Sequence, residues 1–192
     1  MAVEDKIKWD RKYNEHSDLL SRREPSMAIV KNYKECSGNR ALDLASGTGR
    51  NSLFLEDKGF EVDAIDISKL ALDTLKGRSK YHKINTILAD LDEFNLGEER
   101  YDFIVKCNFL DRELIERAKK ALKIGGIMVV ETYMEDKENE KKSSNPNFLL
   151  KQDELLDIFK NGFEVLEYKT FWNESFEKYR MKKVSIVVKR LV

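Results

Sequence analysis

The sequence predicts an α/β protein with one doubly wound, mostly parallel sheet of seven strands that ends in an antiparallel hairpin. The first observation behind this prediction is an alternation of strand-like and helix-like runs between residues 40 and 132, which is typical of parallel strands joined by right-handed crossovers. The second is that the last two strand-like runs are separated by a segment too short for a crossover helix. At 192 residues the chain has the length of one domain, so we expect a single domain over residues 1–192.

The elements follow from the spacing of apolar residues. Short apolar or alternating runs predict strands at residues 40–45, 61–66, 85–89, 101–107, 126–132, 163–171 and 182–190. Apolar residues three or four positions apart predict helices at residues 51–58, 68–77, 111–123 and 152–160, with Ser68 and Asp111 as N-caps. Residues 6–15 and 26–35 also have a helical pattern. We expect residues 1–35 to form a helical arm that packs over the carboxyl edge of the sheet and the site there.

The stretch most informative about function is the turn between the first strand and the helix that follows it. Residues 41–55 read ALDLASGTGRNSLFL, where an apolar run ends at Gly47 and Gly49 and a helical pattern begins at once. Glycine has no Cβ, so the backbone can turn tightly and a ligand can lie against it. Free N–H groups at the start of the helix favour an anionic ligand or one that bears a carboxylate. The turn therefore predicts a site for a nucleoside cofactor.

Acidic residues near this turn help to distinguish possible cofactors. A dinucleotide site of the G-x-G-x-x-G type needs a third glycine, and Ser52 stands in its place. Asp66, about 20 residues beyond the turn, is placed to accept both hydroxyls of a ribose, as either class of nucleotide would need. Asp43 lies four positions before Gly47, and Asp90 ends the third strand. The alternative for Asp43 and Asp66 is that each is a strand-end acid that binds nearby backbone N–H groups.

The run DLASGTGRN and the ordered acids after it resemble the motifs of class I S-adenosylmethionine-dependent methyltransferases, which have a Rossmann-like fold. The segment ALKIGGIMVVET resembles that family's approach to its fifth strand, with Ile124 in place of a proline. Small methyltransferases of the tellurite-resistance and thiol-methyltransferase type are similar over nearly the whole chain, through WDRKY, REPS, GRN, ETYM and NPNFLLKQDELLDIF. The resemblance implies S-adenosyl-L-methionine as the cofactor.

The resemblance assigns cofactor binding to the glycine turn and to the ends of the first four strands. The residues concerned are Asp43, Ala45, Ser46, Gly47, Gly49, Arg50, Asn51, Asp66, Ile67, Asp90, Leu91, Cys107 and Asn108. Asp90 would lie beside the adenine amino group and Leu91 against its ring, with Asp92 and Glu93 as solvated alternatives to Asp90. Arg50 would hold the methionine carboxylate or, alternatively, lie on the surface. For Cys107 the alternative is a small core residue.

The expected reaction is transfer of a methyl group to a small-molecule acceptor, in which the protein aligns the reactants and excludes water. The sequence reveals no general base, and a thiolate or oxyanion needs little or none, so we favour a thiol or a metalloid oxyanion as acceptor. Tyr13, Phe109 and Arg180 are candidate substrate contacts, and no residue is assigned a catalytic role. The tellurite-resistance enzymes have His and Arg in the arm between the last two strands; this arm offers Arg180, Glu174 and Glu177 but no histidine.

The sequence leaves three other functions open: a methyltransferase for RNA or protein, a dinucleotide-dependent reductase, and a module that binds the cofactor without turnover. Composition bears on the possible partners and on the cellular setting. Lys and Arg number 35 and so do Asp and Glu, so no net charge attracts nucleic acid or an anionic membrane. Cys36 and Cys107 form no CxxC pair, which argues against a zinc site and fits a reducing, cytoplasmic setting. No apolar run approaches the ~20 residues of a membrane span. We expect a cytoplasmic monomer or homodimer without a metal.

Overall fold

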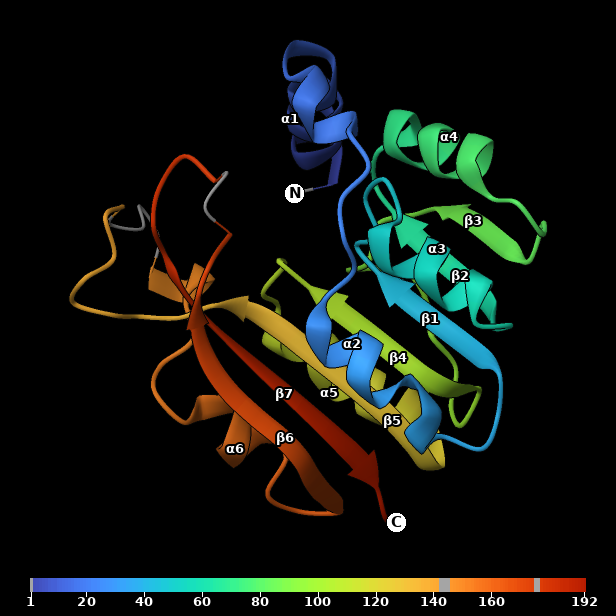
Figure 1. Cartoon of the computed structure of the whole chain (residues 1–192), viewed down its shortest axis with the longest axis vertical. Coiled ribbons are helices and arrows are strands. Elements are labelled where there is room, and N and C mark those ends of the chain that lie inside the picture. Colours follow the sequence, from blue (N-terminus) through green and yellow to red (C-terminus); the bar gives the residue numbers. More distant parts are fainter. Residues whose placement is uncertain (1, 142–145, 175–176) are drawn as a thin grey trace.

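The computed structural model describes residues 2–141, 146–174 and 177–192, which form one sheet with helices around it (Figure 1). The strands are β1 (Arg40–Leu44), β2 (Glu61–Asp66), β3 (Ile84–Leu88), β4 (Tyr101–Cys107), β5 (Leu122–Tyr133), β6 (Phe163–Trp172) and β7 (Lys182–Arg190). Their order is β3-β2-β1-β4-β5-β7-β6, and every neighbouring pair is parallel except the two that β7 makes with β5 and β6. The predicted mostly parallel sheet of seven strands with a C-terminal antiparallel hairpin is confirmed.

Helices cover both faces of this sheet. They are α1 (Ala2–Glu15), α2 (Met27–Asn32), α3 (Arg50–Asp57), α4 (Lys69–Arg78), α5 (Arg112–Ala121) and α6 (Glu154–Ile158), with 3-10 turns at Ser17–Leu20, Tyr33–Glu35 and Pro146–Phe148. Ile29 of α2 and Leu55 of α3 pack with Val105 of β4 on one face. Leu114 of α5 packs with Ile104 on the other. Because successive side chains of a strand point to opposite faces, β4 is buried on both sides and is apolar along most of its length.

The local signals for helix starts are confirmed. The Ser68 hydroxyl accepts a hydrogen bond from the Ala71 N–H at 3.3 Å, and the Asp111 carboxylate accepts one from the Leu114 N–H at 2.9 Å. Each bond satisfies a backbone donor that the first turn of a helix leaves without a partner. These caps fix where α4 and α5 begin, and with them the loops that follow β2 and β4.

Several boundaries differ from the sequence prediction, and those at β5 and α6 have a clear physical cause. The helix predicted to reach residue 123 ends at Ala121, and β5 begins at Leu122 rather than at residue 126. Leu122 is extended, with φ −76° and ψ 133°, and pairs with Tyr101 of β4, so strand pairing replaces the last helical turn. The helix α6 is also shorter than the predicted 152–160, because Asp153 has a left-handed φ of 59° that prevents an earlier start.

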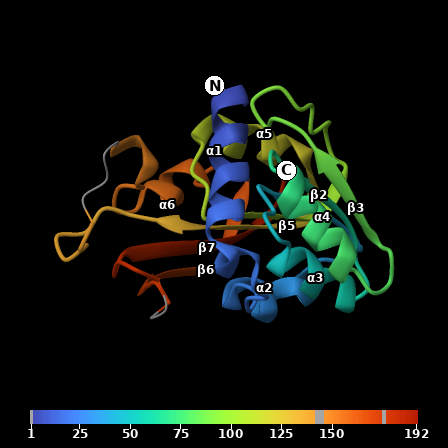
Figure 2. The ribbon, with the colours of Figure 1, turned by 90° about the horizontal axis from the view of Figure 1, so that it is seen from above.

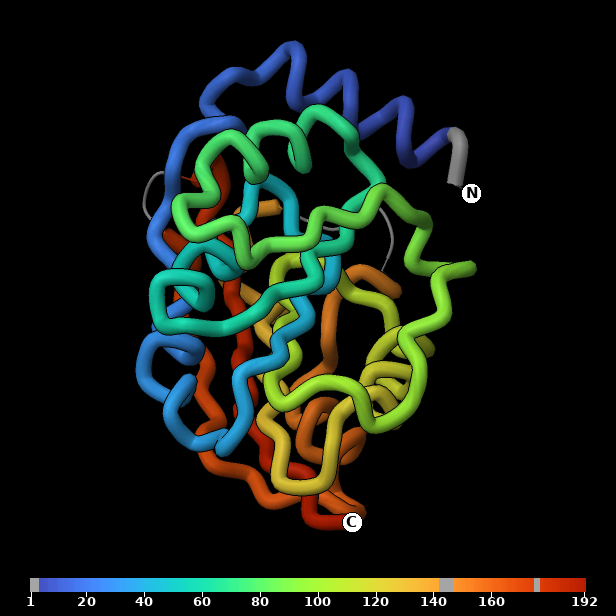
Figure 3. The backbone as a smooth tube through the Cα atoms, turned by 90° about the vertical axis from the view of Figure 1, so that its right-hand side faces the viewer, coloured from blue at the N-terminus to red at the C-terminus, as the bar shows by residue number. Residues whose placement is uncertain are grey.

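The N-terminal helix α1 lies outside both helical layers, across the carboxyl ends of the strands (Figures 1 and 2). It packs beside α4, where the Ser68 hydroxyl donates a hydrogen bond to the Asp10 carboxylate at 2.7 Å. Figure 3 shows α1 and the C-terminal residue at opposite ends of the molecule. Within the ranges described above, no helix is both long and apolar enough to cross a membrane.

Candidate functional site

The glycine turn lies between β1 and α3 at the carboxyl edge of the sheet. Gly47 and Gly49 have φ angles of 55° and 80°, in the left-handed region that other residues rarely adopt. A Cβ at Gly49 would come within 2.1 Å of the Leu75 side chain, and one at Gly47 within 2.9 Å of the Tyr13 hydroxyl. Both backbone conformation and space therefore require glycine here, and Tyr13 of α1 lies against the turn.

Asp66, at the end of β2, holds the turn in place. Its carboxylate accepts the Gly47 N–H at 2.7 Å and the Ser68 N–H at 2.9 Å. Burial raises the pKa of this carboxyl, and the backbone hydrogen bonds oppose that rise. A carboxylate has about four acceptor positions, and the backbone N–H groups do not fill all of them. Asp66 thus binds nearby backbone N–H groups, as expected of a strand-end acid, and it also retains acceptor capacity for a ligand.

Asp43 lies in β1, directly below the turn, and is 2% exposed. The Ser52 hydroxyl of α3 donates a hydrogen bond to its carboxylate at 2.6 Å. Burial raises the pKa of Asp43 to about 6, while Ser52 and the nearby Arg50 guanidinium lower it. The Asp43–Ser52 hydrogen bond therefore ties β1 to the first turn of α3.

Two polar atoms beside the turn lack hydrogen-bond partners. Among the residues that the structure describes, Ser46 Oγ and Arg50 Nη2 are the buried side-chain atoms without one. Arg50 Nη2 does lie 3.5 Å from the Glu131 carboxylate, in an ion pair rather than a hydrogen bond. Unpaired buried polar atoms are uncommon in proteins, and these two belong to the residues directly before and after the glycine turn. They are the atoms that a ligand with hydroxyl or carboxylate groups would satisfy.

The ends of β3 and β4 complete this side of the site. Asp90 is half-buried, and its carboxylate accepts the Asp92 N–H at 3.0 Å, while Leu91 is buried in the core. Cys107 is 8% exposed, and burial raises the pKa of its thiol above its usual range. Asn108 is exposed, with a left-handed φ of 59°. Cys107 therefore has the environment of an inert core thiol, whereas Asn108 and Asp90 are accessible.

A charged cluster lies between the glycine turn and β7, and consists of Arg50, Glu131, Glu174 and Lys183. Lys183 of β7 is fully buried, with its ammonium 3.4 Å from the Glu131 carboxylate and 3.7 Å from that of Glu174. Arg50 lies 3.5 Å from Glu131 and 3.6 Å from Glu174. Burial opposes the ionised form of Glu174, but Lys183 and other partners outweigh it, so the net effect lowers its pKa. The cluster pairs two cations with two carboxylates.

Further hydrogen bonds tie the arm and the β6–β7 loop to this cluster. The Ser26 hydroxyl, just before α2, donates to the Glu131 carboxylate, and the Ser26 N–H donates to Asn51 Oδ1 at 3.0 Å. The Tyr133 hydroxyl donates to the Glu177 carboxylate at 2.5 Å, and burial followed by Glu177 raises the pKa of Tyr133 above its usual range. Asn51, predicted to bind cofactor, thus uses its side-chain oxygen to hold the arm.

Sequence reasoning missed Glu131 and Lys183 as members of the site. The available signal was a charged residue inside an apolar strand run, in VVET for Glu131 and in KKVSIVV for Lys183. A charged residue near the end of such a run usually indicates that the strand reaches solvent there. Both are instead buried, at 4% and 0% exposure, because they lie on the adjacent strands β5 and β7 and contact each other as well as Ser26, Arg50 and Glu174.

The three candidate substrate contacts lie in different surroundings. Tyr13 lies against Gly47, and burial raises its pKa above the usual range, as does the nearby Asp66 carboxylate. Phe109 is half-buried and packs against the core beside α5. Arg180 is stacked 3.6 Å from the Trp172 ring centroid and lies 3.5 Å from the Glu138 carboxylate. The described contacts of Arg180 therefore lie outside the charged cluster. The residue of the β6–β7 arm that belongs to the cluster is Glu174.

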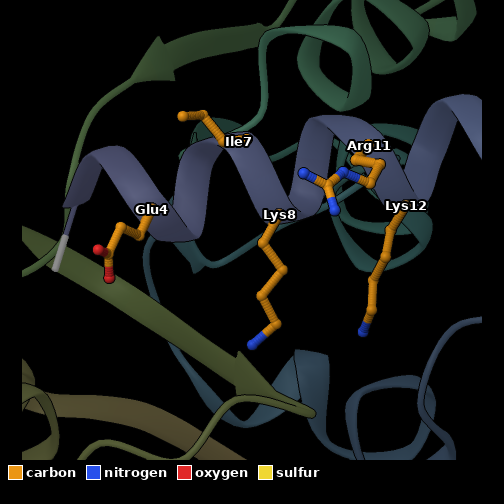
Figure 4. A pocket seen from close by; sticks show the side chains of 5 residues that line it. All are labelled: Glu4, Ile7, Lys8, Arg11 and Lys12. Carbon is orange, nitrogen blue, oxygen red and sulfur yellow. The ribbon is translucent and has the colours of Figure 1, made fainter.

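A cavity of about 430 Å³ lies against α1 and is lined by Glu4, Ile7, Lys8, Arg11 and Lys12. Figure 4 shows Lys8 and Lys12 pointing from α1 toward the ribbons below it. Burial lowers the pKa of Lys12, and the neighbouring cations Lys8 and Lys141 lower it further. Three of the five lining residues are cations, so this cavity favours an anion. Among the described residues, no group of three or more His, Cys, Asp or Glu side chains is arranged to hold a metal ion.

Comparison with known proteins places this chain in a family. Residues 3–181 match the family described as tellurite resistance protein TehB. This chain belongs to the TehB family. It is 30% identical over 170 residues to a protein of Haemophilus influenzae named probable S-adenosyl-L-methionine-dependent methyltransferase TehB, which covers 81% of this chain and 58% of that relative.

Solved structures agree with the family. The crystal structure of TehB from Haemophilus influenzae superposes with a TM-score of 0.75 at 26% identity, over 96% of this chain and 66% of that one. A SAM-dependent methyltransferase from Methanosarcina mazei has the same fold, with a TM-score of 0.66 at 18% identity over 88% of this chain and 100% of that one. The chain spans less than two thirds of the length of its Haemophilus relative in both comparisons.

Proposed function

We propose that this TehB family member transfers a methyl group from S-adenosyl-L-methionine to a small anionic acceptor, a thiolate or a metalloid oxyanion. The observation that carries the proposal is the glycine turn at the carboxyl edge of β1, flanked by Asp43 and Asp66. The Haemophilus influenzae relative is named a probable S-adenosyl-L-methionine-dependent methyltransferase TehB, and a crystal structure of TehB from that species has the same fold, which supports the same conclusion.

The residues at the turn fit this cofactor. A Cβ at Gly47 or Gly49 would collide with the Tyr13 hydroxyl or the Leu75 side chain, so glycine keeps the turn tight. The unpaired Ser46 Oγ and Arg50 Nη2 lie directly before and after it. Asp66 retains acceptor positions for ribose hydroxyls, as the sequence resemblance implies. Asp90, accessible at the end of β3, is assigned to the adenine amino group on the same basis. When bound, the cofactor supplies a methyl group on a sulfonium, which is already activated for transfer.

The residues around the acceptor have three tasks: to attract it, to align it and to exclude water. Lys8, Arg11 and Lys12 place positive charge on the exposed surface of α1, which attracts an anion towards this end of the sheet. The charged cluster, tied to the arm through Ser26, forms a fixed wall. An acceptor that arrives as an anion needs no general base, so the proposed reaction does not require a catalytic residue to remove a proton.

The proposal is tested with S-adenosyl-L-methionine labelled in its methyl group. The full chain is incubated with thiols, metalloid oxyanions, amines, phenols and bulk RNA, and the Gly47→Val variant serves as the blank. We expect label in the thiols or the oxyanions and none with the variant. Transfer to RNA or amines alone would contradict the acceptor class. Calorimetric binding of NADH without binding of S-adenosylhomocysteine would contradict the cofactor and favour a reductase.

A further inference from the structure

Lys106 is a fully buried lysine in the penultimate position of β4. Its Cα neighbours across the sheet are Leu44 of β1 and Val130 of β5, both of them buried in the core. Burial lowers the pKa of Lys106 to about 7, while Asp111 and Cys107 raise it and Arg112 lowers it further. A methionine of the same length would fill this place without desolvating a charge. The lysine therefore needs a reason other than packing.

The contacts of the ammonium group point to the loop that follows β4. Lys106 Nζ donates a hydrogen bond to the Phe109 carbonyl and lies 5.1 Å from the centroid of the Phe109 ring. The same loop begins with Asn108, whose left-handed φ of 59° is unfavourable for a residue with a side chain. The Asn108 N–H donates to the Glu131 carbonyl at 2.8 Å. The loop is thus held on one side by β5 and on the other by Lys106.

We infer that Lys106 is a positioning residue, which keeps residues 108–110 in the conformation that presents Asn108 and Phe109 to the cofactor and the acceptor. That the loop contacts cofactor and acceptor rests on the proposed function. That Lys106 holds the loop in place does not depend on it. Removal of the ammonium leaves the Phe109 carbonyl without this donor, so the loop keeps the Asn108–Glu131 bond and the packing of Phe109 on the core but loses the bond that fixes its main chain. The loop then samples other conformations, while the core gains an apolar side chain.

The experiment compares wild type, Lys106→Met and the matched control Lys120→Met, which removes an exposed lysine from α5. Three quantities are measured on the full chain: the melting temperature, the hydrogen exchange of peptides covering residues 107–113, and the Kd of S-adenosylhomocysteine. For Lys106→Met we expect a melting temperature no lower than wild type, loop exchange about tenfold faster, and a Kd about tenfold weaker. The control should match wild type in all three quantities.

A merely structural role predicts a different combination. If Lys106→Met lowers the melting temperature and binding together, or if it leaves loop exchange and Kd unchanged, the inference is wrong. If wild type does not bind S-adenosylhomocysteine at all, the proposed function fails, and loop exchange alone still decides whether Lys106 positions the loop.

The wild-type chain gives a test that needs no variant. A charged ammonium holds a carbonyl and an aromatic ring more strongly than a neutral amine does, so loop exchange, corrected for its intrinsic pH dependence, should rise between pH 6 and 8.5. The charged and titratable groups that act on Lys106 are Asp111, Arg112 and Cys107. Exchange that does not change across this range would overturn the inference as well.

Discussion

Replacement of Lys183 by methionine tests whether the charged cluster stabilises the fold. Lys183 and Glu131 are almost fully buried, with 3.4 Å between ammonium and carboxylate, so at an effective dielectric constant of about 20 their attraction is about 5 kcal/mol. Breaking one member of a buried pair costs about 3–5 kcal/mol. Because Arg50 still lies 3.5 Å from Glu131 after the change, we expect Lys183→Met to lower the free energy of unfolding by about 3 kcal/mol, the lower end of that range.

The assay is a double-mutant cycle by urea unfolding, with wild type, Lys183→Met, Glu131→Gln and the double variant. The double variant removes one charge of each sign, so it should lose about 2–4 kcal/mol less than the two single changes added together. The control cycle uses Lys69 and Asp73, which are 2.5 Å apart but mostly exposed, and should give a coupling close to zero. A coupling at Lys183 and Glu131 as small as in the control would refute the reasoning.

Three further predictions concern the glycine turn and its acids. Gly47→Val places a side chain against the Tyr13 hydroxyl at a left-handed φ, so we expect calorimetry to give at least tenfold weaker binding of S-adenosylhomocysteine with an unchanged circular dichroism spectrum. Asp66→Ala removes the proposed acceptor for ribose hydroxyls and the carboxylate that holds the Gly47 N–H, so the same titration should show binding weakened by about tenfold or more; unchanged affinity in both variants would refute the placement of the cofactor. Burial raises the pKa of Asp43 from 3.8 to about 6, so its contribution to stability is present below pH 3.8 and is lost as pH rises through 6. Asp43→Asn should therefore gain stability relative to wild type between pH 4 and 7, by up to about 3 kcal/mol in urea unfolding, and a pH-independent difference would contradict the burial argument.

The fold was predictable because its signals are local and repeated. Each buried parallel strand is an apolar run, and the caps at Ser68 and Asp111 mark helix starts within three residues. The errors arose where two local preferences compete. Residues 122 and 123 extend the helical pattern of α5, yet pairing of Leu122 with Tyr101 draws them into β5, and sequence alone does not reveal that partner.

The candidate site was predictable only in part, for the same reason. Gly47, Gly49 and Asp66 belong to one β-turn-α unit and its neighbour, so their spacing in the sequence reflects their spacing in the structure. The charged cluster joins Arg50 to Glu131 and Lys183, which are separated by at least 50 residues along the chain and meet because β7 inserts between β5 and β6. No local pattern encodes such a meeting.

The position of α1 has a consequence for the rate of turnover. Tyr13 lies against Gly47, and Asp10 is bonded to Ser68, so the helix covers the turn from above. If the cofactor binds on the turn as proposed, the arm would enclose it, and its exchange with solvent would require α1 to lift. Each proposed catalytic cycle would then include this motion twice, once to admit the donor and once to release the spent product. Departure of the product, rather than the chemical step, is the event that such an arrangement would make slow.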